Sequence, residues 1–535
     1  MDFTFSEIPE RLFGQAPGPP GYLAARWLFL RSLGLIFFSA FYSLVFQIRG
    51  LIGPNGILPA REYLPEVARV LGGRRIWYAP TVFWWSTSDR FLMAVCVAGI
   101  IASLMLAFNL WPRAALVVCL LAFLSFIGAA QDFASYQSDG MLLEAGFISL
   151  FFVPVGWRPG WGANEPPSRA SRFLLVWLMF RIYFESGIAK ILGRDTEWRD
   201  FTAMGQYYQN GPLPTWIAWY AHHLPHWFHA STAVMTLALE LVLIFAVFLP
   251  WPWRIGLFFL ITPWQIGIIL TSNYAFLNYI VLVLGFLLLD DKFLMPLIPK
   301  RLRDGTQAVT APVASPGIVP AAPQIKPRRW RRAVRLWVQA FFLTWIFYAT
   351  TALLIFMVEP DAPIPTSPIA ALEPFRIANQ FGLFAVMTRN RYEIEFQGSR
   401  DGQTWTPYPF RYKPQDVHAP PRIYAPYQPR FDWNLWFASL GTWRGYPFVL
   451  QVEERLLSGE PDVLSLFGGN PFPERPPEQI RAVLWQYWFS DWNEKRTQGV
   501  WWRREQLGLY APTLQRLPDG KIDVLEWPDA SQTPR

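Results

Sequence analysis

Three charged residues lie inside one long apolar run, at spacings that could support chemistry. Arg181, Glu185 and Lys190 all fall within residues 173–192. Ionisable groups are costly inside a membrane, so each is a functional candidate. Arg181 and Glu185 are four residues apart and can pair on one helix face, whereas Lys190 lies about 140° away around an ideal helix. A desolvated lysine can serve as a base, which makes Lys190 the candidate catalytic residue; structural pairing, or a lysine that reaches the interface, is the alternative.

Further polar residues lie in or beside other apolar runs. They are Glu144, Glu240, Gln265, Asn273 and Asn278. Together with Arg181 and Glu185 they form the expected intramembrane polar set. The sequence does not decide whether they converge on Lys190.

A loop over residues 193–229 is rich in aromatic residues and holds four of the five histidines. No HExxH motif occurs, and the histidines lack a cysteine partner or a clear carboxylate spacing, so we expect no metal site and no cofactor. An aromatic belt at the membrane surface is the preferred interpretation. Aromatic residues of this loop and of the C-terminal part are candidate contacts for a client protein: Trp219, Tyr220, Trp227, Trp433, Trp436, Trp501 and Trp502. Packing in the protein's own core is the alternative for them.

Long apolar runs must position these residues. The chain has 535 residues, of which 52% are hydrophobic and only 16% charged, far fewer charges than the roughly 25% of a soluble protein. Its mean hydropathy of +0.19 fits a membrane domain joined to a polar one. A helix needs roughly 20 apolar residues to cross a bilayer. The candidate spans, about nine in all, are 27–48, 91–110, 114–130, 173–192, 230–249, 255–271 and 336–358, with the shorter 141–155 and 275–289.

The distribution of Lys and Arg predicts the topology. We expect a cytoplasmic segment 1–26, a transmembrane domain 27–289 with the external loop 193–229, a basic, Pro-rich cytoplasmic linker 290–335, a last transmembrane helix 336–358, and an extracytoplasmic domain 359–535. The loop 49–90 does not follow this rule, because it holds six arginines and would nevertheless lie outside. The basic linker most simply meets anionic lipid headgroups, so the net charge of +8 does not indicate nucleic acid.

The polar part reads as a β-rich domain with some helix. Residues 391–396 and 407–412 alternate like strands around an Asp-Gly turn, 448–452 fits a further strand, and 477–488 reads as a helix that begins near its proline. A small sandwich is one possible architecture. The two cysteines, Cys96 and Cys119, fall in expected spans and form no CxxC, which excludes thiol–disulfide exchange chemistry.

Several motifs, in this order along the chain, resemble the lipase maturation factor family. They are residues 210–214 (NGPLP), Trp219-Tyr220, 223–225 (HLP), Trp227, Glu240, 272–274 (SNY), 276–278 (FLN), 381–384 (FGLF), 398–402 (GSRDG), 426–433 (PYQPRFDW), 470–472 (NPF) and 499–503 (GVWWR). The resemblance implies a multi-span folding factor that helps lipases fold and assemble, in the endoplasmic reticulum in animals and in the inner membrane in bacteria. Only 7 of the 47 basic residues are lysine, which hints at a bacterial source.

Two functions therefore compete. The first is a non-catalytic membrane protein that assists the folding of secreted clients such as lipases. The second is a membrane enzyme with Lys190 as base on a lipid-soluble substrate, because residues 183–190 (YFESGIAK) are similar to the segment of vitamin K-dependent γ-carboxylases that carries their base. A transporter is a third reading, but no internal repeat supports it.

Overall fold

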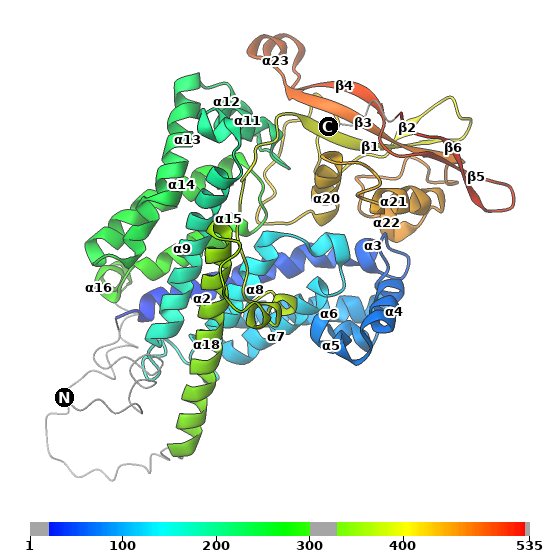
Figure 1. Cartoon of the computed structure of the whole chain (residues 1–535). Coiled ribbons are helices and arrows are strands. Elements are labelled where there is room, and N and C mark those ends of the chain that lie inside the picture. Colours follow the sequence, from blue (N-terminus) through cyan, green and yellow to red (C-terminus); the bar gives the residue numbers. More distant parts are fainter. Residues whose placement is uncertain (1–20, 300–328, 530–535) are drawn as a thin grey trace, which may run out of the picture.

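The computed structural model describes residues 21–299 and 329–529. Most of the expected N-terminal segment and the Pro-rich part of the linker lie outside the described residues. The described chain forms a helical bundle followed by a C-terminal domain built on a β-sheet (Figure 1).

Each expected span coincides with a helix of the bundle. The helices are α2 (Leu23–Val45), α6 (Asp89–Ala107), α7 (Pro112–Ile127), α8 (Gln137–Ser149), α9 (Arg169–Leu192), α13 (His226–Leu241), α14 (Trp251–Thr271), α15 (Leu277–Gly285) and α18 (Arg329–Val358). Five helices are long and apolar enough to cross a bilayer: α2, α6, α13 with its continuation to Phe248, α14, and residues 333–358 of α18. α7 and α15 are apolar but short, α8 has only 13 residues, and α9 carries five charged residues.

Helix α2 forms the centre of the bundle. Two thirds of its apolar window is buried, against a third or less in the other four long helices, which leaves their outer faces apolar and exposed. α2 and α6 approach closely through glycines: a Cβ at Gly99 would lie 2.5 Å from the Phe41 ring, and one at Gly34 would lie 2.7 Å from the Ala107 nitrogen. Small residues at such crossings are typical of membrane helices.

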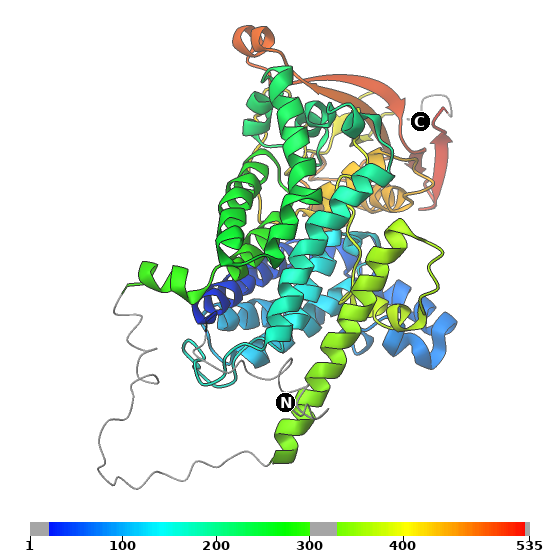
Figure 2. The same ribbon diagram turned by 60° about the vertical axis from the view of Figure 1, so that its left-hand side comes forward.

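Polar side chains tie several segments together at the end of the bundle where α2 begins. The Asp291 carboxylate accepts from the N–H groups of Leu23 and Ala24, at 2.8–2.9 Å. Arg26 donates to the carbonyl of Gly162 at 2.8 Å, and Arg254 donates to the hydroxyl of Tyr22 at 3.0 Å. These contacts bring the starts of α2 and α14 together with the loop before α9 and with the short helix α16 (Asp291–Leu294), which the helix η7 (Met295–Leu297) follows. Figure 2 shows the same end of the bundle from a second side.

Short helices cap the opposite end, where the C-terminal domain sits (Figure 1). They are α3 (Ile48–Ile52), α4 (Ala60–Leu71), η2 (Gly72–Arg74), α5 (Arg75–Tyr78), η3 (Val82–Trp84), η4 (Gln131–Ala134), α10 (Thr196–Arg199), α11 (Ala203–Asn210) and α12 (Trp216–His222). The arginine-rich loop 49–90 belongs to this end as well, because Arg49 pairs with Asp462 at 2.7 Å and the Trp77 ring meets Phe375 at 4.9 Å.

An antiparallel sheet forms the frame of the C-terminal domain. Its strands are β1 (Arg391–Ser399), β2 (Thr406–Pro407), β3 (Gln479–Phe489), β4 (Trp502–Leu509), β5 (Thr513–Arg516) and β6 (Ile522–Glu526), in the order β2-β1-β3-β5-β6, with β4 also paired to β3. The domain's helices are α19 (Ser367–Ala370), η8 (Glu373–Phe375), α20 (Arg430–Ser439), α21 (Phe448–Leu457), α22 (Pro461–Leu464) and α23 (Trp492–Gln498). α20 lies between the sheet and the bundle (Figure 1).

Four local predictions for this domain were wrong. Of the expected strand 407–412, only Pro407 belongs to a strand, the two-residue β2, and residues 408–412 have no regular secondary structure. Residues 448–452 begin the helix α21, whose buried residues Phe448, Val449, Val452, Leu456 and Leu457 follow helical spacing. Residues 477–488 were expected as a helix, but residues 479–489 form the central strand β3, because its aromatic and β-branched side chains pack on both faces of the sheet. The described strands form one sheet and not a sandwich.

Candidate functional site

The charged residues of α9 meet a chain segment that folds back onto the bundle after α18. We call residues 377–388 the return segment. Arg181 is fully buried, pairs with Glu144 of α8, and lies 3.5 Å from Glu185. The same guanidinium donates to the Asn379 carbonyl of the return segment at 2.7 Å. The four-residue spacing thus yields the expected Arg181–Glu185 contact, and Arg181 also binds two partners remote in sequence.

The two carboxylates of this cluster also hold the return segment. Glu144 accepts from the backbone N–H and the side-chain amide of Asn379, each at 3.0 Å. Glu185 accepts from the N–H of Phe381 at 2.7 Å. Breaking such a buried ionic network by removing one partner typically costs about 3–5 kcal/mol. The geometry therefore suits a structural tie between α8, α9 and the return segment.

Lys190 belongs to a second, separate cluster. Its ammonium lies 2.8 Å from a carboxylate oxygen of Glu240 on α13 and 2.8 Å from the Leu383 carbonyl, with the Ser186 carbonyl at 3.4 Å. The Trp198 ring lies 5.0 Å from the same nitrogen, a cation–π contact. Three acceptors therefore surround an ammonium with three protons, and Lys190 is saturated by the protein.

A small cavity adjoins Lys190 and Glu240. Its volume is about 80 Å³, whereas sites for drug-sized ligands measure roughly 300–1,000 Å³. Its walls also carry a hydrogen-bonded chain from the hydroxyl of Tyr183 through Gln265 to Asn278, with links of 2.7 Å. The cavity has room for a few water molecules, and Glu144 and Glu185 do not line it.

Asn273 lies apart from both clusters, between α14 and α15. Its side-chain oxygen accepts from the N–H groups of Tyr424 and Ala425, at 2.6 and 2.9 Å, and its amide donates to the carbonyls of Leu213 and Arg422, at 3.0 and 2.8 Å. One amide thus joins the NGPLP loop to the C-terminal domain. The expected intramembrane polar set is therefore divided among three places.

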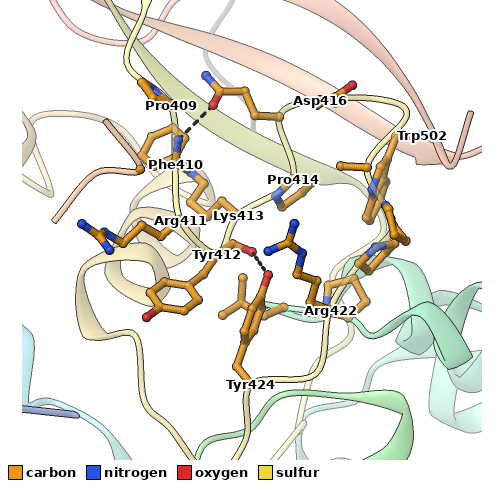
Figure 3. A pocket seen from close by; sticks show the side chains of 17 residues that line it. Pro409, Phe410, Arg411, Tyr412, Lys413, Pro414, Asp416, Arg422, Tyr424 and Trp502 are labelled. Carbon is orange, nitrogen blue, oxygen red and sulfur yellow. Dashed lines mark hydrogen bonds between the residues drawn. The ribbon is translucent and has the colours of Figure 1, made fainter. Parts of the chain in front are cut away.

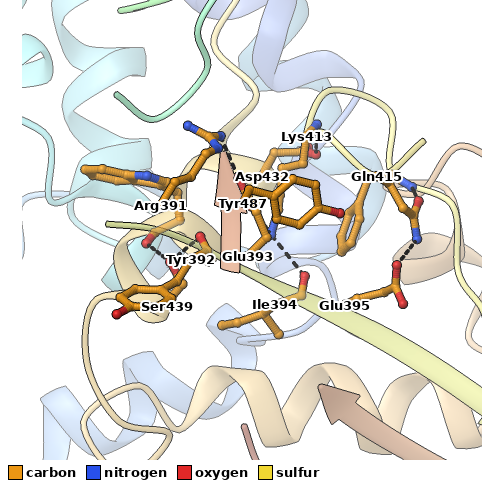
Figure 4. Close-up of polar contacts among 12 residues, drawn as sticks. Arg391, Tyr392, Glu393, Ile394, Glu395, Lys413, Gln415, Asp432, Ser439 and Tyr487 are labelled. Atoms are coloured by element: carbon orange, nitrogen blue, oxygen red, sulfur yellow. Dashed lines mark hydrogen bonds and ion pairs between the residues drawn. The ribbon is translucent and has the colours of Figure 1, made fainter. Parts of the chain in front are cut away.

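A cluster in the sheet continues this junction (Figure 4). Arg391 at the start of β1 is fully buried and donates to the carbonyls of Gln209 and Pro212, at 3.0 and 2.9 Å. Glu393 pairs with Arg391 at 2.5 Å and with Lys413 at 2.9 Å. The NGPLP motif thus supplies backbone acceptors to a buried arginine of the C-terminal domain.

A fourth tie involves Arg430 at the start of α20. Both of its terminal nitrogens lie 2.8 Å from the Asp139 carboxylate oxygens, and one also donates to the Phe133 carbonyl at 2.7 Å. A two-pronged arginine–carboxylate pair fixes orientation as well as distance. No local pattern identifies Asp139, Asn379, Arg391 or Arg430 as partners, and only the position of Arg430 inside the PYQPRFDW motif points to it.

Most candidate client contacts are interior residues. Trp219, Trp433, Trp436 and Trp502 are each at most 7% exposed. Trp219 packs against the rings of Trp492 and Trp501, at 4.7 and 5.8 Å, because α12 lies under the β3–β4 connection. Packing in the protein's own core therefore accounts for these four, and of the remaining candidates Tyr220 and Trp227 are 40% and 67% exposed.

The histidine-rich loop makes internal contacts. His223 hydrogen bonds the Trp219 carbonyl at 2.7 Å, and burial, followed by the neighbouring His223 and His229, lowers the pKa of His222 to about 4. Within residues 21–299 and 329–529, no group of three or more His, Cys, Asp or Glu side chains is placed to hold a metal ion.

A polar pocket of about 540 Å³ opens between the NGPLP loop and residues 409–424 (Figure 3). Its walls carry the cations Arg411, Lys413 and Arg422. Lys413 is neutralised by Glu393, whereas the guanidinium of Arg422 points into the pocket and that of Arg411 points away from its centre (Figure 3).

Comparisons with known proteins place this arrangement in a family. The model of the lipase maturation factor transmembrane domain matches residues 24–296, and that of the lipase maturation factor C-terminal domain matches residues 377–512. Lipase maturation factor 2 of Gallus gallus is 31% identical over 96% of this chain and 83% of its own length, and lipase maturation factor 1 of Bos taurus is 31% identical over 94% and 91%. No solved structure matches. The chain is therefore a member of the lipase maturation factor family.

Proposed function

We propose that this protein is a membrane-anchored folding factor that assists the maturation of secreted hydrolases of the lipase class, without catalysing a reaction itself. The main support for this proposal is the buried junction between the bundle and the C-terminal domain. Four polar ties fasten the two parts together, and they are centred on Arg181, Lys190, Arg391 and Arg430. A surface mounted on such a rigid frame can remain apolar and exposed without collapsing onto the protein's own core.

The proposed topology has nine crossings, with α7, α8, α9 and α15 completing the five long spans. Under this topology the loops at Arg113, 154–168, 250–254 and 290–299 face the cytoplasm, and those at 46–88, 128–136, 193–225 and 272–276 face the outside. The second set contacts the C-terminal domain, for example through Arg49–Asp462 and Asn273–Tyr424. This alternation supports an extracytoplasmic C-terminal domain in the plasma membrane of a bacterium or in the endoplasmic reticulum of a eukaryote.

The proposed client surface consists of Trp216, Tyr220, Trp492 and Trp501, which we call the aromatic surface. Neighbouring rings lie 5.8–6.3 Å apart, and Trp216 and Trp492 are 44% and 50% exposed. Exposed aromatic residues that cluster in this way mark protein interaction sites. The surface joins α12 of the bundle to α23 of the C-terminal domain, so it exists only when the two parts are assembled.

The alternative enzymatic function gains no support from the geometry. Lys190 has three protein acceptors, and the adjoining cavity is far smaller than a lipid-soluble substrate requires. We therefore propose Lys190 as a positioning residue that holds the return segment against α9 and α13.

The decisive experiment measures the specific activity of a secreted lipase per unit of lipase antigen in a host that lacks this gene. Complementation with the wild-type chain should restore this activity, and a Tyr220→Ala/Trp492→Ala chain should restore much less. The matched control is Trp527→Ala, because Trp527 is also an exposed tryptophan of the C-terminal domain (60% exposed) but lies outside the aromatic surface.

Two outcomes would contradict the proposal. One is a deletion strain whose secreted lipases keep their full specific activity. The other is a Tyr220→Ala/Trp492→Ala chain that is present in the membrane at the wild-type level and restores activity as well as Trp527→Ala does.

A further inference from the structure

We infer that the outer end of α2 and the adjoining groove of the C-terminal domain form a binding site for an anionic phospholipid. Its phosphate is held by Arg411, and one of its acyl chains lies along α2. This site is independent of the aromatic surface and is assigned by three observations: an uncovered apolar stripe, a groove in line with it, and a cationic side chain in that groove.

The apolar stripe runs along one face of α2. Leu35, Tyr42 and Phe46 are 56%, 44% and 56% exposed, and Phe38 stacks on Tyr42 at 5.7 Å. Spacings of three, four and four residues place these side chains on one helix face. α2 is otherwise the most buried of the candidate spans, so this stripe is the part of α2 that the bundle leaves open to lipid.

The stripe leads directly into a groove of about 460 Å³. Tyr42, Phe46 and Gln47 of the bundle form one wall, and residues of the C-terminal domain form the other: Arg411, Tyr412, Tyr427, Phe431, Asp432, Ser465 and Leu466. The Tyr42 and Tyr427 rings lie 6.4 Å apart across the junction. The groove is therefore apolar on the α2 side and polar toward the C-terminal domain, which matches the two ends of a phospholipid.

Arg411 supplies the charge. Its Nε donates to the Phe467 carbonyl at 2.7 Å, which orients the side chain, and its terminal nitrogens have no acceptor within the described part of the chain. An arginine fork suits a phosphate because it donates two parallel hydrogen bonds. The acidic residue of the groove, Asp432, is 2% exposed and accepts from the N–H of Lys413 at 3.3 Å. Its carboxylate is therefore largely withdrawn from the groove and repels a phosphate on Arg411 only weakly.

The dimensions favour a lipid over a soluble anion or an acidic peptide. Leu35 and Phe46 are eleven residues apart, a rise of roughly 16 Å along a helix, and one leaflet of the hydrocarbon core is about 15 Å thick. The stripe thus extends from the middle of the bilayer to the outer headgroup level in the proposed topology. A free phosphate ion or an acidic peptide would leave an apolar stripe of this depth uncovered.

The test is native mass spectrometry of the full chain, purified in a neutral detergent and titrated with long-chain phosphatidylglycerol. Phosphatidylcholine, dihexanoyl phosphatidylglycerol and inorganic phosphate serve as comparison probes. We expect long-chain phosphatidylglycerol to bind most tightly, and Arg411→Gln to weaken its binding about tenfold. Arg411→Lys, which keeps the charge and loses the fork, should fall between the two. The matched control is Arg444→Gln, because Arg444 is an exposed arginine of the same domain that stacks on Trp443.

A second pair of variants tests the acyl-chain part. Leu35→Trp fills the stripe and should weaken long-chain binding, whereas Ile101→Trp, at an equally exposed position of α6 (55%), should not. Any of four results would overturn the inference: equal affinity for phosphatidylcholine and phosphatidylglycerol, equal affinity for short and long chains, displacement of the lipid by millimolar phosphate, or unchanged binding in Arg411→Gln and Leu35→Trp.

Discussion

Lys190 on α9 and Glu240 on α13 form an ion pair of 2.8 Å inside the bundle, and the same ammonium donates to the Leu383 carbonyl 2.8 Å away. One side chain therefore joins two helices to the return segment. This arrangement is the one that the proposed positioning role of Lys190 requires.

The role of Lys190 is tested by comparing single and double substitutions. Lys190→Met leaves Glu240 buried without its partner and should lower the free energy of unfolding by about 3–5 kcal/mol. Lys190→Met/Glu240→Gln removes both charges and should regain most of that loss. Thermal unfolding in detergent measures both effects. A double variant that is stable and present in the membrane but has lost all client activity would favour a base over a structural role.

The tie between Arg430 and Asp139 should dominate the docking of the C-terminal domain. Arg430→Met leaves the Asp139 carboxylate buried without its partner and should lower the free energy of unfolding by about 3–5 kcal/mol. In limited proteolysis, a protease should cleave this variant between the bundle and the C-terminal domain sooner than it cleaves the wild type. Arg422→Met is the control, because Arg422 is exposed at the wall of a pocket, and it should change stability by no more than about 0.5 kcal/mol. Equal protease resistance in the two variants would contradict the assignment.

Two tryptophans of the 193–229 loop should behave oppositely. Trp219 is fully buried, so Trp219→Ala should cost about 3–5 kcal/mol of unfolding free energy. Trp227 is 67% exposed, and Trp227→Ala should leave the thermal midpoint nearly unchanged. If both variants unfold at the wild-type temperature, the packing described for α12 is wrong.

Asp432 gives a pH dependence of defined sign. Burial raises the pKa of Asp432 to about 7, and the nearby Lys413 only partly opposes this. The folded state therefore holds the proton more tightly than the unfolded chain, whose Asp pKa is about 3.9. The stabilising effect is complete below pH 4 and is lost as the pH rises to 7, by about 1.4 kcal/mol for each unit of pKa difference.

The measurement compares the wild type with Asp432→Asn, which cannot titrate. The stability of the wild type relative to this variant should decline from pH 4 to pH 7 and then level off. Parallel unfolding curves for the two proteins across that range would show that Asp432 is not perturbed.

Cysteine labelling tests the topology. Cys96 and Cys119 are both buried, so an impermeant maleimide should give little background. In intact cells a cysteine in Arg400→Cys, on the β1–β2 turn, should react, whereas one in Arg158→Cys should react only after permeabilisation. Both positions are exposed. Labelling of Arg158→Cys alone in intact cells would invert the proposed orientation.

Helical periodicity alone was sufficient to predict part of the contacts in the candidate site. The spacing of Arg181, Glu185 and Lys190 predicted both the contact within α9 and the exclusion of Lys190 from it, since that depends only on the helix repeat. Their partners outside α9 include Glu144, Asn379 and Leu383, which are 37 to 198 residues away. Such contacts depend on how helices pack and on where the chain returns, which local patterns do not encode.

The C-terminal domain was harder to predict because its two central strands, β1 and β3, are largely buried on both faces. β3 shows no clean alternation of polar and apolar residues, and Pro477 just before it resembles the start of a helix. The opposite error at α21 has the same origin: five residues such as Phe448–Val452 are too few to separate a two-residue from a 3.6-residue repeat. The buried tryptophans were misplaced because composition does not distinguish interface rings from core rings.

The charges of α9 also constrain the order in which the protein is made. Under the proposed topology, Arg181, Glu185 and Lys190 enter the bilayer roughly 200 residues ahead of the return segment, whose amide and carbonyl groups complete their hydrogen bonds. Until the ribosome has delivered Asn379 through Leu383, these charges have the ionic partners Glu144 of α8 and Glu240 of α13 but lack their hydrogen bonds to the return segment. Under the proposed topology, the bundle therefore completes its internal hydrogen bonds only after the return segment has crossed the membrane.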